Sequence, residues 1–222
     1  MWRFVKDIFD WTNIFGMTRN TPIPVFTSGV RLFCATDDPT INNVNGTNIT
    51  VYSTKNGTTH IDTYDTLVNA GLAVSSDATT EIQIVGNLTG AWAINSGDYI
   101  EIEVSDTAIT SLDASNNIGH LTNIVLHNNT SLVALDCNDC TSLVALDLSG
   151  NSYITSLNCG NCPAITFIYF DAYESQPSGE IAQMITNALT TTGVWSTSNA
   201  VAPYYSVVET AANNKGWTIF TD

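Results

Sequence analysis

Two pairs of cysteines are the residues of this chain whose type and spacing most directly suggest chemistry. Cys137 and Cys140 form one Cys-x-x-Cys pair, and Cys159 and Cys162 form a second pair after eighteen intervening residues. Because thiolates are strong zinc ligands, two such pairs at this spacing would by themselves indicate a tetrahedral zinc site. A disulfide is the other chemistry open to paired cysteines. Both interpretations depend on where the surrounding chain places the four thiols.

The cysteines lie within a repeat, which is the strongest pattern in the sequence. Six copies of an apolar-x-x-apolar-x-apolar motif follow one another: ITSLDASNN from Ile109, LTNIVLHNN from Leu121, LVALDCNDC from Leu132, LVALDLSGN from Leu143, ITSLNCGNC from Ile154 and ITFIYFDAY from Ile165. Their central apolar residues are spaced 12 and then four times 11 apart, at Leu112, Ile124, Leu135, Leu146, Leu157 and Ile168. The alternation in each copy predicts a short strand whose apolar side chains point inward.

Eleven residues provide one strand and one turn, which is half of a coil. Two halves make a coil of about 22 residues with strands on two sides, and stacked coils bury a shared apolar interior. Residues one coil apart are then expected to lie above one another, at about the 4.8 Å separation of neighbouring strands. We expect the Asn side chains that end several copies to bond the free backbone groups of the turns: Asn117, Asn129 and Asn151.

This arrangement gives the cysteines a structural interpretation. Cys137 and Cys159 fall in the inward slot that Leu148 occupies in the copy between them, whereas Cys140 and Cys162 fall in the Asn slot. Small buried thiols suit a narrow interior, so we interpret the four residues as structural ladders without a metal. Zinc and a disulfide remain the alternatives.

The alternation of LxxLxCxxC with LxxLxLxxN resembles the short bacterial leucine-rich repeats called IRREKO, which occur in Bacteroidota and in phages associated with them. The similarity covers residues 109–170, and a helix with a closing Lys-Gly-Trp-Thr strand, here at 215–218, often follows such repeats in phage-like proteins. The resemblance implies a leucine-rich-repeat solenoid that works by presenting a surface. It also implies that the C-terminal segment caps the open end of the stack.

We therefore predict a mainly β protein with a short solenoid of 11-residue half-coils, with strands on two sides. Four parts are expected along the chain: an N-terminal amphipathic docking helix and linker at 1–20, a β-rich region at 21–79, the solenoid at 80–172 and a C-terminal α/β cap at 173–222. Alternation and an Asn-Gly turn signal support the β-rich region, in which 62–72 nevertheless read as a short helix. Two further helices are expected in the cap, at 180–189 and 204–214.

The N-terminal segment is predicted to be an amphipathic helix because its apolar residues recur at helical spacing. The set expected to dock onto a partner is Trp2, Phe4, Val5, Ile8, Phe9, Trp11 and Phe15. Packing onto the chain's own core and self-association, for example as a homotrimer, are the other uses of such a face. Lys6, Asp7 and Asp10 interrupt the apolar stretch, so it does not read as a secretion signal.

The charge distribution argues against two classes of partner. The net charge is −15, and no Lys or Arg occurs between Asn56 and Asn214. Contacts with nucleic-acid phosphates need cations, and an anionic membrane surface repels so acidic a stretch. No apolar run is long enough to cross a bilayer. We therefore expect neither a nucleic-acid nor a membrane partner.

The residue that follows each central apolar residue is expected to point outward and to form an exposed strand face. Asp113, Asp136 and Asn158 lie on one side of the predicted coils, and Asp147 and Tyr169 lie on the other. Stacked carboxylates repel one another unless a cation or water separates them, so a weak Ca²⁺ site is one interpretation. We favour solvated surface carboxylates and predict no metal.

No nucleophile elbow, phosphate-binding loop, metalloprotease or dinucleotide motif accompanies the three histidines, so we predict no catalytic residue and no cofactor. The leading hypothesis is a phage virion surface component, such as a capsid decoration, head fibre or tail-associated protein. It would attach to other virion proteins through the N-terminal helix and bind a host-surface glycan or protein. The alternative is a bacterial cell-surface or secreted leucine-rich-repeat binding module. An enzyme acting on polysaccharide is the third hypothesis.

Overall fold

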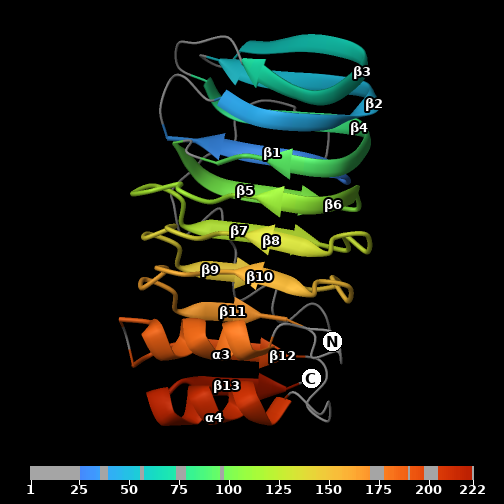
Figure 1. Ribbon diagram of the computed structural model, residues 1–222. Helices are drawn as coiled ribbons and strands as arrows, with labels where there is room; N and C mark the ends of the chain where they lie inside the picture. Colours follow the sequence, from blue (N-terminus) through green and yellow to red (C-terminus); the bar gives the residue numbers. More distant parts are fainter. Residues whose placement is uncertain are drawn as a thin grey trace.

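The protein is a tall stack of β-strands with two helices at one end, as the computed structural model in Figure 1 shows. The structure describes residues 26–35, 40–55, 58–73, 79–95, 98–170, 178–189, 191–197 and 205–221. Their fold is mainly β, and the sheet that connects the strands does not close on itself. The predicted N-terminal helix, with its docking residues, lies outside the described residues.

Long antiparallel strands form the upper end of the stack. Strand β2 (Thr40–Lys55) and strand β3 (Thr58–Ala73) pair antiparallel along their length, from Thr40 with Ala73 to Lys55 with Thr58. Strand β4 (Thr79–Ala93) pairs with β2 on one side and with β1 (Gly29–Cys34) on the other. The upper end therefore has the strand content that the sequence predicts for the β-rich region.

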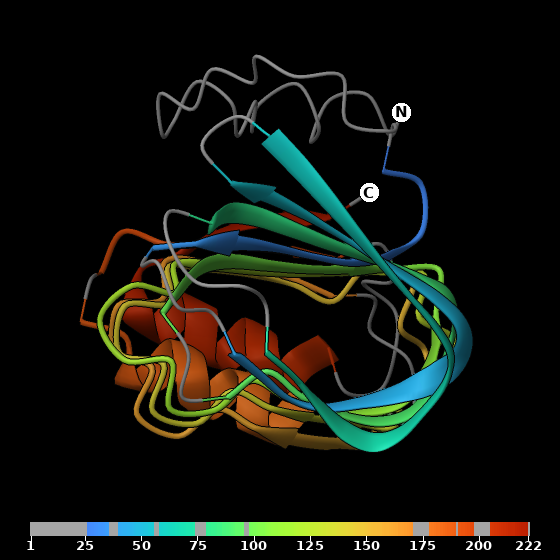
Figure 2. The same cartoon turned by 90° about the horizontal axis from the view of Figure 1, so that it is seen from above.

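Below this region the strands become short and pair in parallel, in two ladders on opposite sides of the molecule. Ladder A begins with β5 (Tyr99–Ser105), β7 (Asn123–His127), β9 (Ala145–Asp147) and β11 (Phe167–Tyr169). Ladder B runs from the end of β4 through β6 (Ala108–Asp113), β8 (Ala134–Asp136) and β10 (Ser156–Asn158). The chain alternates between the ladders, so successive strands lie on opposite sides (Figure 2).

The central apolar residues of the repeat align in register. On ladder A, Ile124 pairs with Leu146 and Leu146 with Ile168, each 22 positions further along the chain. On ladder B, Leu135 pairs with Leu157 at the same interval. All five are buried in one core cluster between the two ladders. The sequence period therefore matches the observed strand register.

Helices replace ladder B at the lower end of the stack. Helix α3 (Ser178–Asn187) precedes strand β12 (Val194–Thr197), and helix α4 (Tyr205–Lys215) precedes strand β13 (Thr218–Thr221). Both strands extend ladder A in parallel, while the helices continue the opposite side (Figure 1). The two helices lie where the sequence predicts them. Neither is long and apolar enough to cross a membrane.

The helix predicted at 62–72 is wrong, because these residues belong to β3. Thr63 pairs with Thr50, and Ile61 pairs with Tyr52, so the segment continues the hairpin that begins at Lys55. The apolar spacing within this segment also fits a helix, but β-branched and aromatic residues favour a strand once a partner strand is present. Tertiary pairing decides the outcome here.

Candidate functional site: the outer faces of the two ladders

The strand register places the predicted outward residues in two columns. On ladder B, Asp113 pairs with Asp136, and Asp136 pairs with Asn158. On ladder A, Asp147 pairs with Tyr169 in the same manner. The expectation that Asp113 and Asp136 lie next to each other on one face is therefore confirmed by the pairing of β6 with β8.

The outer face of ladder B is open to solvent and carries small or polar side chains. Asp113 and Asp136 are half-buried and Asn158 is exposed. The other outward position on each of these strands holds a small residue, at Ser111, Ala134 and Ser156. Among the described residues, no bulky side chain points outward from these three strands.

The outward carboxylates hold the turns that follow their strands, a role that sequence reasoning missed. Oδ1 of Asp136 accepts a hydrogen bond from the backbone N–H of Asn138 at 2.9 Å. Asp147 accepts in the same way from Ser149, also at 2.9 Å, as does Asp113 from Ser115 at 3.0 Å. Asp side chains favour this bond to the N–H two residues on. The sequence contains one signal of this role, because an Asp recurs at the same position of the repeat as Asp113, Asp136 and Asp147.

The second carboxylate oxygens on ladder B accept from side-chain amides. Asp136 Oδ2 accepts from Asn158 Nδ2 at 3.2 Å, and Asp113 Oδ2 accepts from the amide of Asn95. Amide donors therefore occupy the space in which a cation would bind. Within the described residues, no group of three or more His, Cys, Asp or Glu side chains could hold a metal ion.

The outer face of ladder A differs, and one prediction there is wrong. Tyr169 was expected to be exposed, but its side chain is only 7% exposed. Phe167 at 8% and Ala145 at 6% join it in a small apolar cluster that is separate from the main core, with Val194 packed against it. Two aromatic side chains on an outer face lower the free energy when they leave water, which favours a covered surface here.

Asparagines hold the turns at the end of ladder A, as the sequence predicts. Asn129 donates from Nδ2 to the carbonyl of Val104 at 2.8 Å, and Asn151 donates to Leu126 at 2.7 Å. The backbone N–H of Asn129 in turn donates to Asn151 Oδ1 at 3.2 Å. Both side chains are fully buried. They bond backbone carbonyls near the ends of β5 and β7.

Cysteine thiols take the same place on the ladder B side. Cys140 Sγ lies 3.2 Å from the carbonyl oxygen of Ala114, and Cys162 Sγ lies 3.1 Å from that of Cys137. All five cysteines of the chain are free. Burial raises the pKa of the Cys140 thiol from 9.0 to about 12, so the thiol keeps the proton that it donates. This geometry supports the structural interpretation of the cysteines.

The backbone is left-handed at the residue that precedes each of four turn residues, namely Asn117, Asn129, Cys140 and Cys162. The φ angles are 57° at Asn116, 55° at Asn128, 59° at Asp139 and 56° at Asn161. Asn and Asp adopt this conformation more readily than other residues that carry a Cβ atom. The requirement explains why the polar tail of the repeat is so rich in Asn, Asp and Gly.

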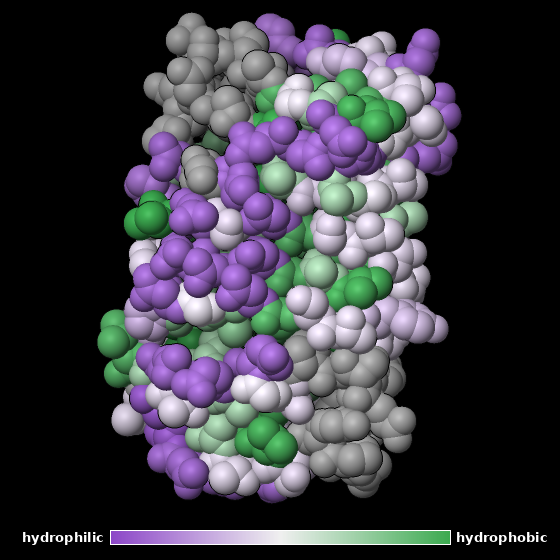
Figure 3. Space-filling view, in the orientation of Figure 1, coloured by the Kyte–Doolittle hydropathy of each residue, from purple (hydrophilic) through white to green (hydrophobic). Residues whose placement is uncertain are grey.

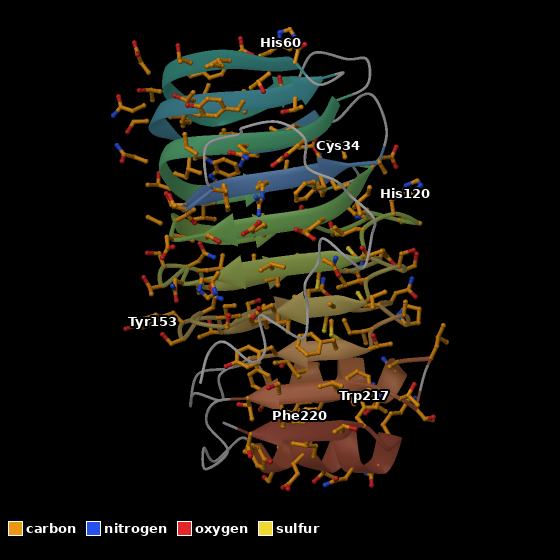
Figure 4. All side chains as sticks on the ribbon, turned by 180° about the vertical axis from the view of Figure 1, so that it is seen from behind. Cys34, His60, His120, Tyr153, Trp217 and Phe220 are labelled. Atoms are coloured by element: carbon orange, nitrogen blue, oxygen red, sulfur yellow. The ribbon has the colours of Figure 1, made fainter. Side chains whose placement is uncertain are left out.

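The histidines do not converge on one site. His60 lies at the upper end of the stack, and His120 lies lower, at one edge (Figure 4). His127 Nδ1 is 3.2 Å from the hydroxyl of Ser149, a contact that the 22-residue interval could have predicted. Ser149 is buried, so its hydroxyl has no open path to a substrate. The arrangement fits a structural hydrogen bond within the turn column.

A cavity of about 360 Å³ lies at the upper end, between β2, β3 and β4. Its lining includes Asn45, Thr66, Asn69 and Thr89, and it contains no carboxylate, histidine or cysteine. Asn45 is held in place, because its Oδ1 accepts from the backbone N–H of Asn69 at 2.8 Å. The cavity therefore offers hydrogen-bonding groups without a pair of acids.

Hydrophilic side chains run along the face shown in Figure 3, with only small hydrophobic patches between them. The exposed, hydrogen-bonded surface of ladder B is the best-defined candidate site in the part of the chain that the structure describes.

Comparison with family models, with curated proteins and with solved structures finds no match to this chain.

Proposed function

We propose that the chain is a short leucine-rich-repeat solenoid of the IRREKO type that acts as a non-enzymatic interaction protein. The observation that carries this proposal is the pairing of equivalent residues 22 positions apart on both ladders, such as Leu135 with Leu157 and Leu146 with Ile168. In this interpretation α3, β12, α4 and β13 form the C-terminal cap. The function of such a stack is to hold a surface rigid.

The outer face of ladder B is the surface that we propose for recognition. Its turns are fixed by the bonds of Asp113 and Asp136 to their own turns, so the polar groups are already ordered before a ligand binds. An ordered surface loses little conformational entropy on binding. Side-chain amides and carboxylates on a shallow face suit a glycan or a polar protein surface.

We further propose that the protein is a phage virion surface component. The resemblance of residues 109–170 to repeats of Bacteroidota and their phages supports this, as does the net charge of −15, which keeps a displayed protein soluble. Residues 1–20 would attach the protein to other virion proteins. Many copies on one particle would bind a host-surface glycan or protein with avidity, even if each site is weak.

Mass spectrometry of purified virions tests this proposal. We expect the protein in particles that survive a density gradient, and we expect a chain that begins at Thr21 to be absent from them. Detection in the bacterial envelope fraction, with none in virions, would favour the bacterial binding module. A glycan array then tests recognition, with loss of binding expected for Asn158→Ala and unchanged binding for the exposed Tyr153→Ala control.

A further inference from the structure

The outer face of ladder A is covered along several consecutive strands. Besides Phe167 and Tyr169, the outward side chain of Asn123 on β7 is only 1% exposed, and Ser196 on β12 is buried. On ladder B the outward residues of β6 and β8 are half-buried, and those of the end strand β10, Ser156 and Asn158, are exposed. A single sheet layer with one face in water does not bury outward side chains this far, which is the burial expected if another segment lies against this face.

The chain approaches this face just before β1. The guanidinium carbon of Arg31, which points outward from β1, lies 4.6 Å from the ring centre of Phe26 and 5.4 Å from that of Phe33. Arg31 also donates from Nε to Glu103 on the neighbouring strand β5 at 2.8 Å. Phe26 therefore sits on the outer side of ladder A, and the 25 residues that precede it begin their path there.

Charge and reach both favour these residues as the cover. Residues 1–25 hold Arg3, Lys6 and Arg19 against Asp7 and Asp10, a net charge of +1, whereas the outer face of ladder A carries the carboxylates of Glu101, Glu103 and Asp147. From β1 to β11 there are four strand steps, or about 19 Å. A helix over the apolar part of 1–15 spans about 20 Å, and the remaining residues provide the link to Phe26.

We propose that residues 1–25 of this chain pack against the outer face of ladder A, with their apolar side chains on the cluster of Ala145, Phe167 and Tyr169. The inference concerns the free protein and does not depend on a virion role. On a virion, residues 1–20 would have to leave ladder A in order to attach the chain to other virion proteins. It goes beyond the proposed function because it assigns the two faces of the stack to different tasks. Ladder A holds the chain's own N-terminal segment, and ladder B faces the partner.

Limited digestion with trypsin tests this assignment in the full chain. Trypsin can cut only after Arg3, Lys6, Arg19, Arg31, Lys55 and Lys215, so three of its six sites report on the N-terminal segment. Wild-type protein should be cut slowly after Arg19. Replacing both aromatic residues, Phe167→Ser with Tyr169→Ser, should speed cleavage there at least tenfold, as followed by mass spectrometry.

The matched control replaces the equivalent residues of β10, as Ser156→Ala with Asn158→Ser, and should leave cleavage after Arg19 unchanged. Cleavage after Arg31, in β1, reports on folding and should stay slow in every variant. If the double aromatic variant is also cut after Arg31, Trp11→Ser takes its place, because it alters the cover and leaves the strands intact. Rapid cleavage after Arg19 in the wild type overturns the proposal. Protection that disappears on dilution also overturns it, since the cover would then come from a second copy.

Discussion

Ladders A and B are built from one repeat, share one core and present opposite kinds of outer surface. Their inward residues are interchangeable, as Leu146 on ladder A and Leu135 on ladder B illustrate. Their outward residues are not: β11 carries Phe167 and Tyr169, whereas β10 carries Ser156 and Asn158. The repeat therefore dictates what fills the interior, and each outer face is free to take its own role.

Most turns also differ between the ladders, although on ladder B the turn after β6 is closed by the buried amide of Asn117. Buried amides close the turns after β7 and β9, whereas thiols close those after β8 and β10. An Asn side chain can both donate and accept, and Asn151 does both, donating to the carbonyl of Leu126 and accepting from the backbone N–H of Asn129. A thiol is a weak donor to a single carbonyl. We therefore expect the turns closed by Asn to be held more firmly than those closed by Cys.

The largest expected effect tests whether the two ladders share one core. Leu135→Ala and Leu146→Ala should each lower the free energy of unfolding by about 2–5 kcal/mol, because both remove a fully buried side chain and leave a cavity. Urea denaturation followed by circular dichroism measures the loss. The exposed Val133→Ala is the control and should change little. Two separate transitions, or a loss on one ladder only, would contradict a shared core.

The next effect compares the two kinds of turn. Asn151→Ala should cost about 2–3 kcal/mol, because it leaves the buried carbonyl of Leu126 and the backbone N–H of Asn129 without their side-chain partner. Cys140→Ala should cost only about 1 kcal/mol, since one weak donor is lost. Equal losses in urea melts of the two variants would show that thiols close the turns as firmly as amides do.

Alkaline pH should weaken the protein through its buried thiols. Burial raises the pKa of Cys34 and of Cys140 from 9.0 to about 12. Above pH 9 the unfolded chain loses these protons and the folded chain keeps them, so stability falls as pH rises from 9 towards 12. The loss between pH 9 and pH 10 should be about 1 kcal/mol per thiol.

Urea midpoints at pH 7, 8, 9 and 10 measure this dependence. Below pH 8 the thiols should not change the urea midpoint of the wild type with pH. Above pH 9 the midpoint of Cys140→Ala should fall less steeply than that of the wild type. The Asn-closed turns of ladder A contain no such group, so Asn151→Ala should decline as steeply as the wild type. An identical slope in wild type and Cys140→Ala would be evidence against the raised pKa.

The smallest expected effect concerns the exposed face of ladder B. Asp136→Ala removes the acceptor for the N–H of Asn138 and should cost about 0.5–1 kcal/mol. Asp136→Asn keeps an acceptor in the same place and should retain most of that stability. Thermal melts of both variants make the comparison. If Asp136→Asn destabilises as much as Asp136→Ala, the charge is needed at this position, and the turn bond is not its main role.

The sequence predicts the regular part of this fold well because the repeat is self-consistent. A period of 11 residues places Leu146 between Leu135 and Leu157 in the chain and on the opposite ladder in space, as observed. The Asn and Cys positions follow from the same period. The repeat period does not predict which outward residue of a pair is buried, since Tyr169 and Asp147 occupy equivalent slots and differ in burial.

The failures come from places where long-range pairing overrides a local pattern. Residues 62–72 read as a helix, and only their pairing with β2 makes them a strand. The burial of Phe167 and Tyr169 is left open by the period, and the only local hint of it is that both outward slots of β11 hold aromatic residues. The contact between His127 and Ser149 was equally accessible from the 22-residue interval.

One step of ladder B has a consequence for how the chain can be modified. Leu112 pairs with Leu135, 23 positions away, so this coil is one residue longer than its neighbours, yet the register is kept. The bend near Gly119 is open, since a Cβ atom built there would meet no other atom within 4 Å. The corner of the stack between β6 and β7 is thus a natural entry point for a peptide label or a small added domain. Cargo grafted there would point into solvent, while the hydrogen bonds above and below it stay in place.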